Sequence, residues 1–156
     1  MNAVFKNREN IVSFKEGNIA VDCRLYDSAD MVCTDYFHIN DIADCIIDMK
    51  VNTAICSIYN IEYYITSEDL HEIVPYRMLL NQVFDAIRKL YENVIFVTRI
   101  SCDNPYAYKF CVSNGFVDYS FMSNLENSSL LLLNDNEISN KIWDYIVEHY
   151  KKNGNK

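Results

Sequence analysis

The sequence predicts an α/β (α+β) domain in which a mixed central sheet is flanked by helices. A chain of 156 residues suits one hydrophobic core. Half of the residues are hydrophobic, which is enough to build a packed interior. Beyond residue 52, apolar runs with strand character alternate with amphipathic segments of helical spacing. We expect a single domain over residues 1–152 and a flexible tail over residues 153–156.

Charge and cysteine spacing argue against several classes of protein. The net charge is −8 and no basic run exceeds two residues, which disfavours nucleic acid as a partner. The six cysteines contain no Cys-x-x-Cys pair, so we expect no metal site and a reducing compartment. The polar first ten residues, and the lack of an apolar run of roughly 18 residues, predict a soluble, cytoplasmic protein that does not bind a membrane.

The N-terminal part is predicted to contain one strand and two short helices. Residues 18–26 alternate between apolar and polar side chains, as a half-buried strand does. Helical patterns follow within residues 28–37 and within residues 40–50, and Asn40 is a suitable N-cap for the second.

The middle of the chain gives the clearest pattern. Residues 52–59 and 60–69 are expected to form two strands joined by a tight turn. Residues 75–93 follow as a long helix that begins at Pro75, with apolar side chains at helical spacing. Residues 93–100, apolar and rich in β-branched side chains, are predicted to be a buried central strand.

A short helix with clear ends is predicted next. Asn104 is a good N-cap, Pro105 fits the first helical position, and Gly115 is suited to a left-handed stop. Strands are expected within residues 116–122 and 128–134.

The last predicted element is an amphipathic helix over residues 134–152. Trp143 lies off its apolar stripe. It is either a contact anchor for a protein partner or a side chain packed on a neighbouring loop.

The short helix carries a family resemblance. Its sequence resembles the motif of the GCN5-related N-acetyltransferases (GNAT), in the positions of Asn104, Ala107, Phe110, Gly115 and Phe116. The order of strand, long helix and strand before it is similar as well, and the resemblance covers residues 52–133. It implies a GNAT-like sheet and acetyl-CoA as the cofactor, with a protein or small-molecule amine as the acyl acceptor.

In that family, acetyl-CoA lies in a wedge between two splayed central strands, and its pyrophosphate rests on amides at the start of the long helix. The resemblance therefore implies cofactor contacts from Tyr76, Arg77 and Asn104. The family usually has a glycine-rich phosphate loop, because glycine lets the backbone close on the phosphates. Residues 66–77 of this chain contain no glycine and carry three acidic side chains, which would repel phosphate.

The catalytic positions implied by the resemblance also depart from the family. Cys111 stands where many members place the tyrosine that protonates the leaving thiolate, and Tyr108 or Tyr106 lies close enough in sequence to substitute. Glu62 is the candidate general base and His71 the second candidate. Each has a structural alternative: Cys111 as a core thiol, Glu62 on a solvated strand face, and His71 on a loop surface.

The sequence YYITSEDL at residues 63–70, a long helix that ends in KLYENVIFV at residues 89–97, and the later Asn-x-x-Ala and Gly-Phe pairs resemble small acetyltransferase-like proteins of tailed phages, which also lack the glycine loop. This narrower resemblance implies a GNAT-fold protein with weak or lost catalysis, found in the host cytoplasm or the virion, that binds a host or virion protein through the C-terminal helix. An active acetyl-CoA-dependent N-acetyltransferase is the alternative. An unrelated α+β binding module is a third reading.

Overall fold

The computed structural model describes residues 2–5, 11–26, 54–91, 94–119 and 127–133, together with four single positions between residues 140 and 148. The elements in chain order are β1 (Asn2–Phe5), β2 (Ile11–Glu16), β3 (Ile19–Tyr26), β4 (Ala54–Tyr59), α2 (Ile61–Tyr64), α3 (Leu70–Arg88), β5 (Val94–Ser101), α4 (Pro105–Ser113), β6 (Phe116–Asp118) and β7 (Ser128–Leu133). Within these ranges, no helix has the length and apolar character needed to cross a bilayer.

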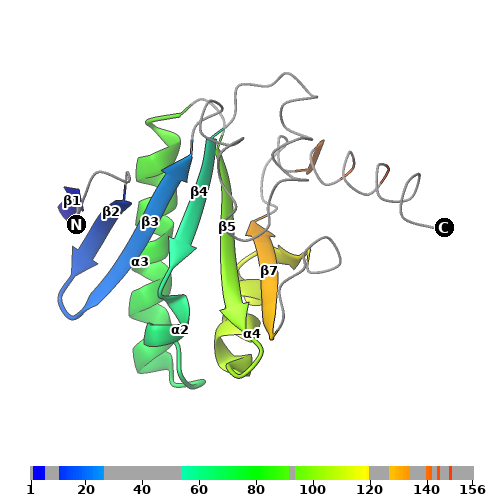
Figure 1. The fold of residues 1–156 in the computed structure, drawn as a ribbon. Coiled ribbons are helices and arrows are strands. Elements are labelled where there is room, and N and C mark those ends of the chain that lie inside the picture. The colour runs from blue at the N-terminus through cyan, green and yellow to red at the C-terminus, as the bar shows by residue number, and fades with distance from the viewer. Residues whose placement is uncertain are drawn as a thin grey trace.

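The strands of the described ranges form one seven-stranded mixed sheet in the order β1-β2-β3-β4-β5-β7-β6 (Figure 1). Strands β4 and β5 are parallel, and every other neighbouring pair is antiparallel. Parallel neighbours need a crossover, which α3 provides. The predicted mixed sheet flanked by helices is confirmed.

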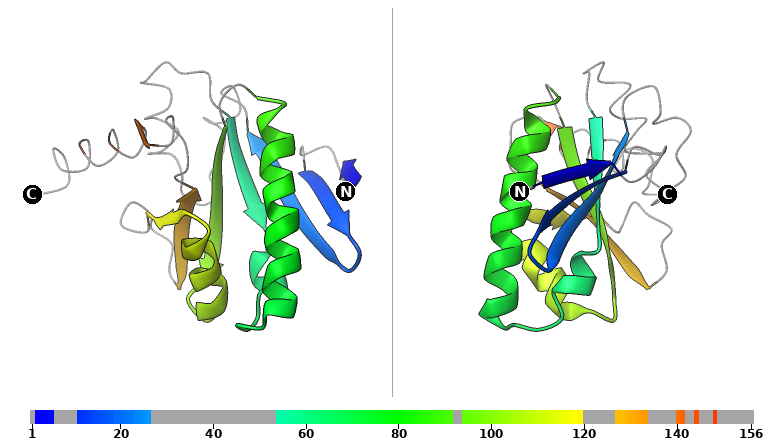
Figure 2. Two further views of the ribbon diagram at one scale, coloured as in Figure 1. Left: turned by 180° about the vertical axis from the view of Figure 1, so that it is seen from behind. Right: turned by 90° about the vertical axis from the view of Figure 1, so that its left-hand side faces the viewer.

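Helices α3 and α4 cover the same face of this sheet, as the view from behind shows (Figure 2). The buried side of α3 is lined by Tyr76, Leu79, Leu80, Val83, Phe84 and Ile87. These side chains pack against alternate residues of β2 to β5 in one hydrophobic core.

Most of the predicted strands are present. Residues 18–26, 52–59, 93–100 and 128–134 correspond to β3, β4, β5 and β7, and the strand predicted over 116–122 begins as β6. The sequence reading did not identify β1 and β2. A two-residue turn with Gly17 at φ +60° joins β2 to β3.

The prediction of a second strand over residues 60–69 is wrong. Residues 61–64 form α2, and a turn follows it. Asn60 ends β4 in the left-handed conformation, at φ 69°. Ile61 and Ile65 are both buried, and their spacing of four residues suits one face of a helical turn rather than one face of a strand.

The long helix begins at Leu70, five residues before the predicted start at Pro75, and ends at Arg88. Asp69 is its N-cap, since a carboxylate oxygen accepts a hydrogen bond from His71 N at 2.9 Å. Pro75 lies inside the helix with its ring exposed.

The short helix is as predicted. Asn104 Oδ1 accepts a hydrogen bond from Ala107 N at 3.0 Å, and Pro105 is the first helical residue. Gly115 adopts φ +95°, a conformation that L side chains rarely adopt.

Other predicted features fall on residues that the structure does not describe. These are the two short helices within 28–37 and 40–50, Trp143 and the tail 153–156. The C-terminal helix over 134–152 also lies outside the described residues, except for single positions.

Candidate functional site

The candidate site lies at the carboxyl ends of the parallel strands β4 and β5, where α/β sheets commonly bind ligands. The β4–β5 pairing ends at Ile58 and Thr98, and Thr98 Oγ1 donates a hydrogen bond to Ile58 O at 3.0 Å. Strand β5 continues to Ser101 beside β7, without β4 on its other side. The two central strands therefore part at this point.

Helix α2 follows β4 directly and lies at its carboxyl end (Figure 1), where it contacts the end of β5 and the start of α4. Ser101 N, at the end of β5, donates to Glu62 Oε2 at 3.3 Å. The side-chain amide of Asn104 donates to Glu62 O at 3.2 Å and to Ile65 O at 3.0 Å. One asparagine thus caps α4 and also joins α4 to α2.

The start of α2 is also bonded to β3, the strand on the other side of β4 from β5. Asn60 Nδ2 donates a hydrogen bond to Oδ2 of Asp22, a side chain of β3 that is 8% exposed. This bond holds Asn60 in its left-handed conformation, which asparagine tolerates better than most residues.

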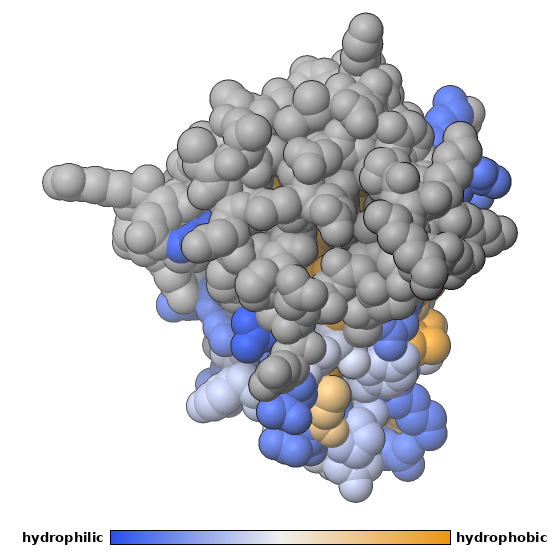
Figure 3. All heavy atoms as spheres, turned by 45° about the vertical axis from the view of Figure 1, so that its right-hand side comes forward, coloured by the Kyte–Doolittle hydropathy of each residue, from blue (hydrophilic) through white to orange (hydrophobic). Residues whose placement is uncertain are grey.

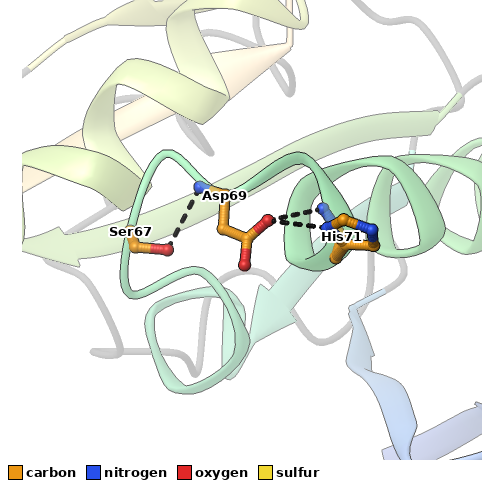
Figure 4. Close-up of polar contacts among 3 residues, drawn as sticks. All are labelled: Ser67, Asp69 and His71. Atoms are coloured by element: carbon orange, nitrogen blue, oxygen red, sulfur yellow. Dashed lines mark hydrogen bonds and ion pairs between the residues drawn. The ribbon is translucent and has the colours of Figure 1, made fainter.

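The turn before α3 is closed by carboxylates of the chain itself. Glu72 Oε1 accepts hydrogen bonds from Thr66 N and Ser67 N, the latter at 3.0 Å, and its Oε2 accepts from Thr66 Oγ1 at 2.9 Å. Asp69 N donates to Ser67 Oγ at 3.1 Å, while the Asp69 carboxylate contacts both the backbone and the ring of His71 (Figure 4). These bonds satisfy amides that an anion at the start of the helix would use.

An aromatic stack lies between α2, α3 and α4. Tyr76 is fully buried, stacks on Tyr64 with 5.5 Å between ring centroids, and meets Phe110 edge-on at 5.8 Å. Burial raises the pKa of the Tyr76 hydroxyl well above its usual value, with smaller contributions from Cys23 and Cys111. Its hydroxyl has no hydrogen-bond partner among the described residues. Tyr76 is therefore placed as a core side chain beside the site.

Cys111 lies in the core, whereas the Tyr108 hydroxyl contacts β6. The Cys111 side chain is fully buried, and burial, with a smaller contribution from the nearby Glu62 carboxylate, raises the pKa of its thiol to about 12. The thiol is therefore protonated at neutral pH. Tyr108 donates to Asp118 Oδ2 at 2.8 Å, and this hydrogen bond, together with burial, raises its pKa.

A cleft of about 210 Å³ lies between the first turns of α3 and the outer side of α4. Its lining residues are Ser67, Glu68, Ile73, Arg77, Tyr106, Lys109, Phe110 and Ser113. Lys109 Nζ is 2.7 Å from Glu68 Oε1, an ion pair between two exposed side chains. Arg77 lines the same cleft, and its buried Nε has no hydrogen-bond partner among the described residues.

The structure brings some of the predicted residues together and separates others. Glu62 and Asn104 are in direct contact, and Cys111 lies close enough to Glu62 for its pKa to be affected. Tyr108 instead bonds to β6, and His71 is 97% exposed at the start of α3. Arg77 lines the cleft between α3 and α4 together with Phe110.

Sequence reasoning missed Glu72 as a contributor to the site. The sequence Asp69-Leu-His-Glu72 has the spacing of a capping box, which would have placed the helix start at residue 70. It also missed Asp22, for which no local signal exists, because its partner Asn60 is 38 residues away.

The described part of the chain holds no group of three or more His, Cys, Asp or Glu side chains arranged to bind a metal ion. On the side of the molecule in Figure 3, the described surface is mainly hydrophilic, with small apolar areas between polar side chains. No protein-family model, curated protein or solved structure matches the chain.

Proposed function

We propose that this chain is a GNAT-fold protein of the tailed-phage type whose acetyl-CoA site is closed by its own residues. It acts by binding a protein partner, in the host cytoplasm or in the virion, and transfers acetyl groups weakly or not at all. The resemblance of residues 52–133 and the parallel β4–β5 pair followed by a long helix support the fold part of this proposal.

The observation that carries the proposal is the position of α2. In the family that the sequence resembles, the cofactor lies between the two central strands where they splay. In this chain the β4–β5 pairing ends at Ile58 and Thr98, and α2 follows at once, held there by contacts to Ser101 and Asn104. The backbone of residues 60–65 is bonded within the helical turn and to Asn104, so it does not offer an extended edge to a ligand.

The start of α3 supports the same conclusion. The family places the cofactor pyrophosphate on amides at the start of the long helix. Here the Glu72 carboxylate accepts from the Thr66 and Ser67 amides, and a second anion at that position would be repelled by it.

The direct test is calorimetric titration of the full chain with acetyl-CoA at millimolar concentration, together with a thermal-shift measurement. We expect neither heat of binding nor stabilisation. A saturable heat, with stabilisation that follows the ligand concentration, would refute the closed site.

The Glu72→Ala variant sharpens this test, because it removes the internal carboxylate and leaves α2 in place. If α2 closes the wedge, this variant also fails to bind acetyl-CoA. If the variant binds and the parent does not, Glu72 alone closes the site and the role given to α2 is wrong.

The α3–α4 cleft favours one alternative, an active acetyl-CoA-dependent N-acetyltransferase in which Arg77 contacts a phosphate of the cofactor. In that case Glu62 would act as the base, and Tyr108 or Cys111 as the proton donor. Release of free CoA thiol in the presence of small amines or a protein acceptor distinguishes the two functions. Turnover that is lost in Glu62→Gln would favour the enzyme.

A further inference from the structure

The corner between α4 and β6 contains the dipeptide Asn114–Gly115. Asn114 is the C-cap of α4, and Gly115 is exposed to solvent with φ +95°. Asparagine is a thermolabile residue, and it is most labile before glycine, because glycine has no side chain to hinder attack of its nitrogen on the asparagine side chain. The pair is therefore a place where the chain can be modified without an enzyme.

The reaction is an intramolecular substitution followed by hydrolysis. Gly115 N loses its proton to hydroxide and forms a bond to Cγ of Asn114. The bond from Cγ to Nδ2 breaks, and the leaving nitrogen takes a proton from water to depart as ammonia. Water then opens the resulting succinimide at one of its two carbonyl groups. One opening leaves aspartate, and the other leaves isoaspartate, in which the main chain runs through the former side chain.

Three features of the folded corner oppose this attack. Asn114 has ψ 15°, which places Gly115 N beside the backbone nitrogen of Asn114 and away from its side chain. The Gly115 N–H donates a hydrogen bond to Val112 O at 3.2 Å. The side-chain Nδ2 of Asn114 donates to Phe110 O at 2.7 Å, which fixes the amide on the end of the helix. The nucleophile and the carbon that it attacks are thus held apart while the last turn of α4 is formed.

Contacts between α4 and its surroundings hold the corner from both sides. Tyr108 Oη donates to Asp118 Oδ2 at 2.8 Å and so joins α4 to β6 across the Asn114–Gly115 pair. Phe116, directly after the pair, is 2% exposed and lies opposite Leu133 of β7. Phe116 is thus fixed in the core, so the end of α4 has to move for the corner to open, and that movement works against the Tyr108–Asp118 bond.

We propose that Asn114–Gly115 is a deamidation site gated by the end of α4. The native fold protects it, and it reacts when the last turn of the helix opens. Neither product restores the corner. Aspartate places a carboxylate against Phe110 O and at the negative end of the helix dipole, and isoaspartate adds a methylene to the main chain between α4 and β6. The reaction therefore loosens this corner irreversibly, whether or not the chain binds acetyl-CoA.

Peptide mass mapping of the full chain during incubation at mildly alkaline pH measures the rate; mapping is needed because Asn153–Gly154 is a second Asn–Gly pair in the sequence. A synthetic peptide with the sequence of residues 110–118 gives the rate without the fold. At about fivefold for each of the two hydrogen bonds, the native chain should react about 25-fold more slowly than the peptide. Equal rates, or no product after several of these longer half-lives, would overturn the proposal.

Tyr108→Phe tests whether opening of the corner sets the rate. It removes the bond to Asp118 and keeps the ring, so Asn114 should react about fivefold faster than in the parent. Tyr106→Phe is the matched control, because it makes the same change on the same helix at an exposed side chain that lines the α3–α4 cleft. This control should react at the parent rate. Equal rates in the two variants would refute gating by the α4–β6 corner.

Asn114→Asp, which has the covalent structure of one of the two products, tests the consequence of the reaction. Asn114→Ala is its reference, since it loses the bond to Phe110 O without adding a charge. Asn114→Asp should unfold at a lower urea concentration than Asn114→Ala, and both should unfold at a lower concentration than the parent. If Asn114→Asp is as stable as the parent, the product restores the corner and the irreversible loosening is refuted.

Discussion

The most informative single position is Asn104, because its side chain performs two separable tasks. Its Oδ1 caps α4, and its Nδ2 donates to the carbonyl oxygens of Glu62 and Ile65 in the α2 segment. Three substitutions separate the tasks. Asn104→Ser keeps a capping oxygen and loses the two donated hydrogen bonds. Asn104→Asp keeps the cap but places a carboxylate against the two carbonyl oxygens. Asn104→Ala loses the cap and both donated bonds.

The expected costs follow from the bonds. Loss of a cap costs about 1 kcal/mol. Each net hydrogen bond contributes about 1 kcal/mol. Asn104→Ser should therefore lower the free energy of unfolding by about 2 kcal/mol, and Asn104→Ala by about 3 kcal/mol. Asn104→Asp should cost more than Asn104→Ser, because its charge is placed against two carbonyl oxygens.

Urea unfolding measures the loss in free energy of unfolding, and an unchanged m-value shows that the variants change stability alone. Hydrogen exchange at the Ile65 amide shows whether the loss lies in the α2 segment. That amide donates to Ile61 O at 2.9 Å within α2, so it should exchange faster in Asn104→Ser than in the parent. If Asn104→Ser is within about 0.5 kcal/mol of the parent, the α2–α4 link contributes nothing and the proposed closure of the site is wrong.

Three further predictions concern the same end of the molecule. Glu72→Ala should lower the free energy of unfolding by about 1 kcal/mol or more, since two amides and a hydroxyl lose their acceptor; urea unfolding measures this, and no change would contradict the role of Glu72 in the turn. The hydrogen bonds from the His71 backbone and side chain lower the pKa of Asp69, so its stabilisation is present above the usual pKa of aspartate and is lost as the pH falls through the lower folded value. Asp69→Ala should therefore be less stable than the parent at pH 7, and the difference should shrink in acid; a difference that grows in acid would contradict the sign. Iodoacetamide should modify exposed Cys102 in the native protein and leave buried Cys111 unmodified, as peptide mass mapping would show, and rapid labelling of Cys111 would contradict its burial and raised pKa.

Local signals in the sequence were enough for most of the described fold. The run over residues 93–100 is a buried central strand because it is apolar on both faces, and the short helix is bounded by Asn104 and Gly115 as its capping residues predict. Strands β1 and β2 were missed, although β2 alternates with Val12 and Phe14 buried on one face. This alternating run, with the polar Ser13 and Lys15 between apolar residues, is only six residues long. It directly follows the polar start of the chain, so the strand pattern was too short to be recognised.

The site could be predicted only in part, for a physical reason. The cap at Asn104 is a contact over three residues and can be read from spacing, but the same side chain also bonds residues 39 and 42 positions away. Glu62 was predicted to lie in a strand, whereas the structure places it in α2. That outcome depended on burying Ile61 and Ile65 together, which a local pattern of alternation does not reveal.

The contacts of α2 also set how strongly a ligand would have to bind to open the site. Under the proposed function, admitting a cofactor between β4 and β5 would break five hydrogen bonds: the Ser101–Glu62 bond, two bonds from Asn104, and the backbone bonds from Tyr63 N to Asn60 O and from Ile65 N to Ile61 O. At about 1 kcal/mol each, these five bonds oppose opening by about 5 kcal/mol, before any re-exposure of the two buried isoleucines. Because every 1.4 kcal/mol is about tenfold in affinity, an intrinsic micromolar ligand would bind with an apparent affinity of about millimolar or weaker. Under the proposed function these bonds are a quantitative barrier to cofactor binding, and Asn104→Ser and Asn104→Ala should lower it equally, because both remove the two bonds to Glu62 and Ile65 and the cap of α4 is not part of the barrier.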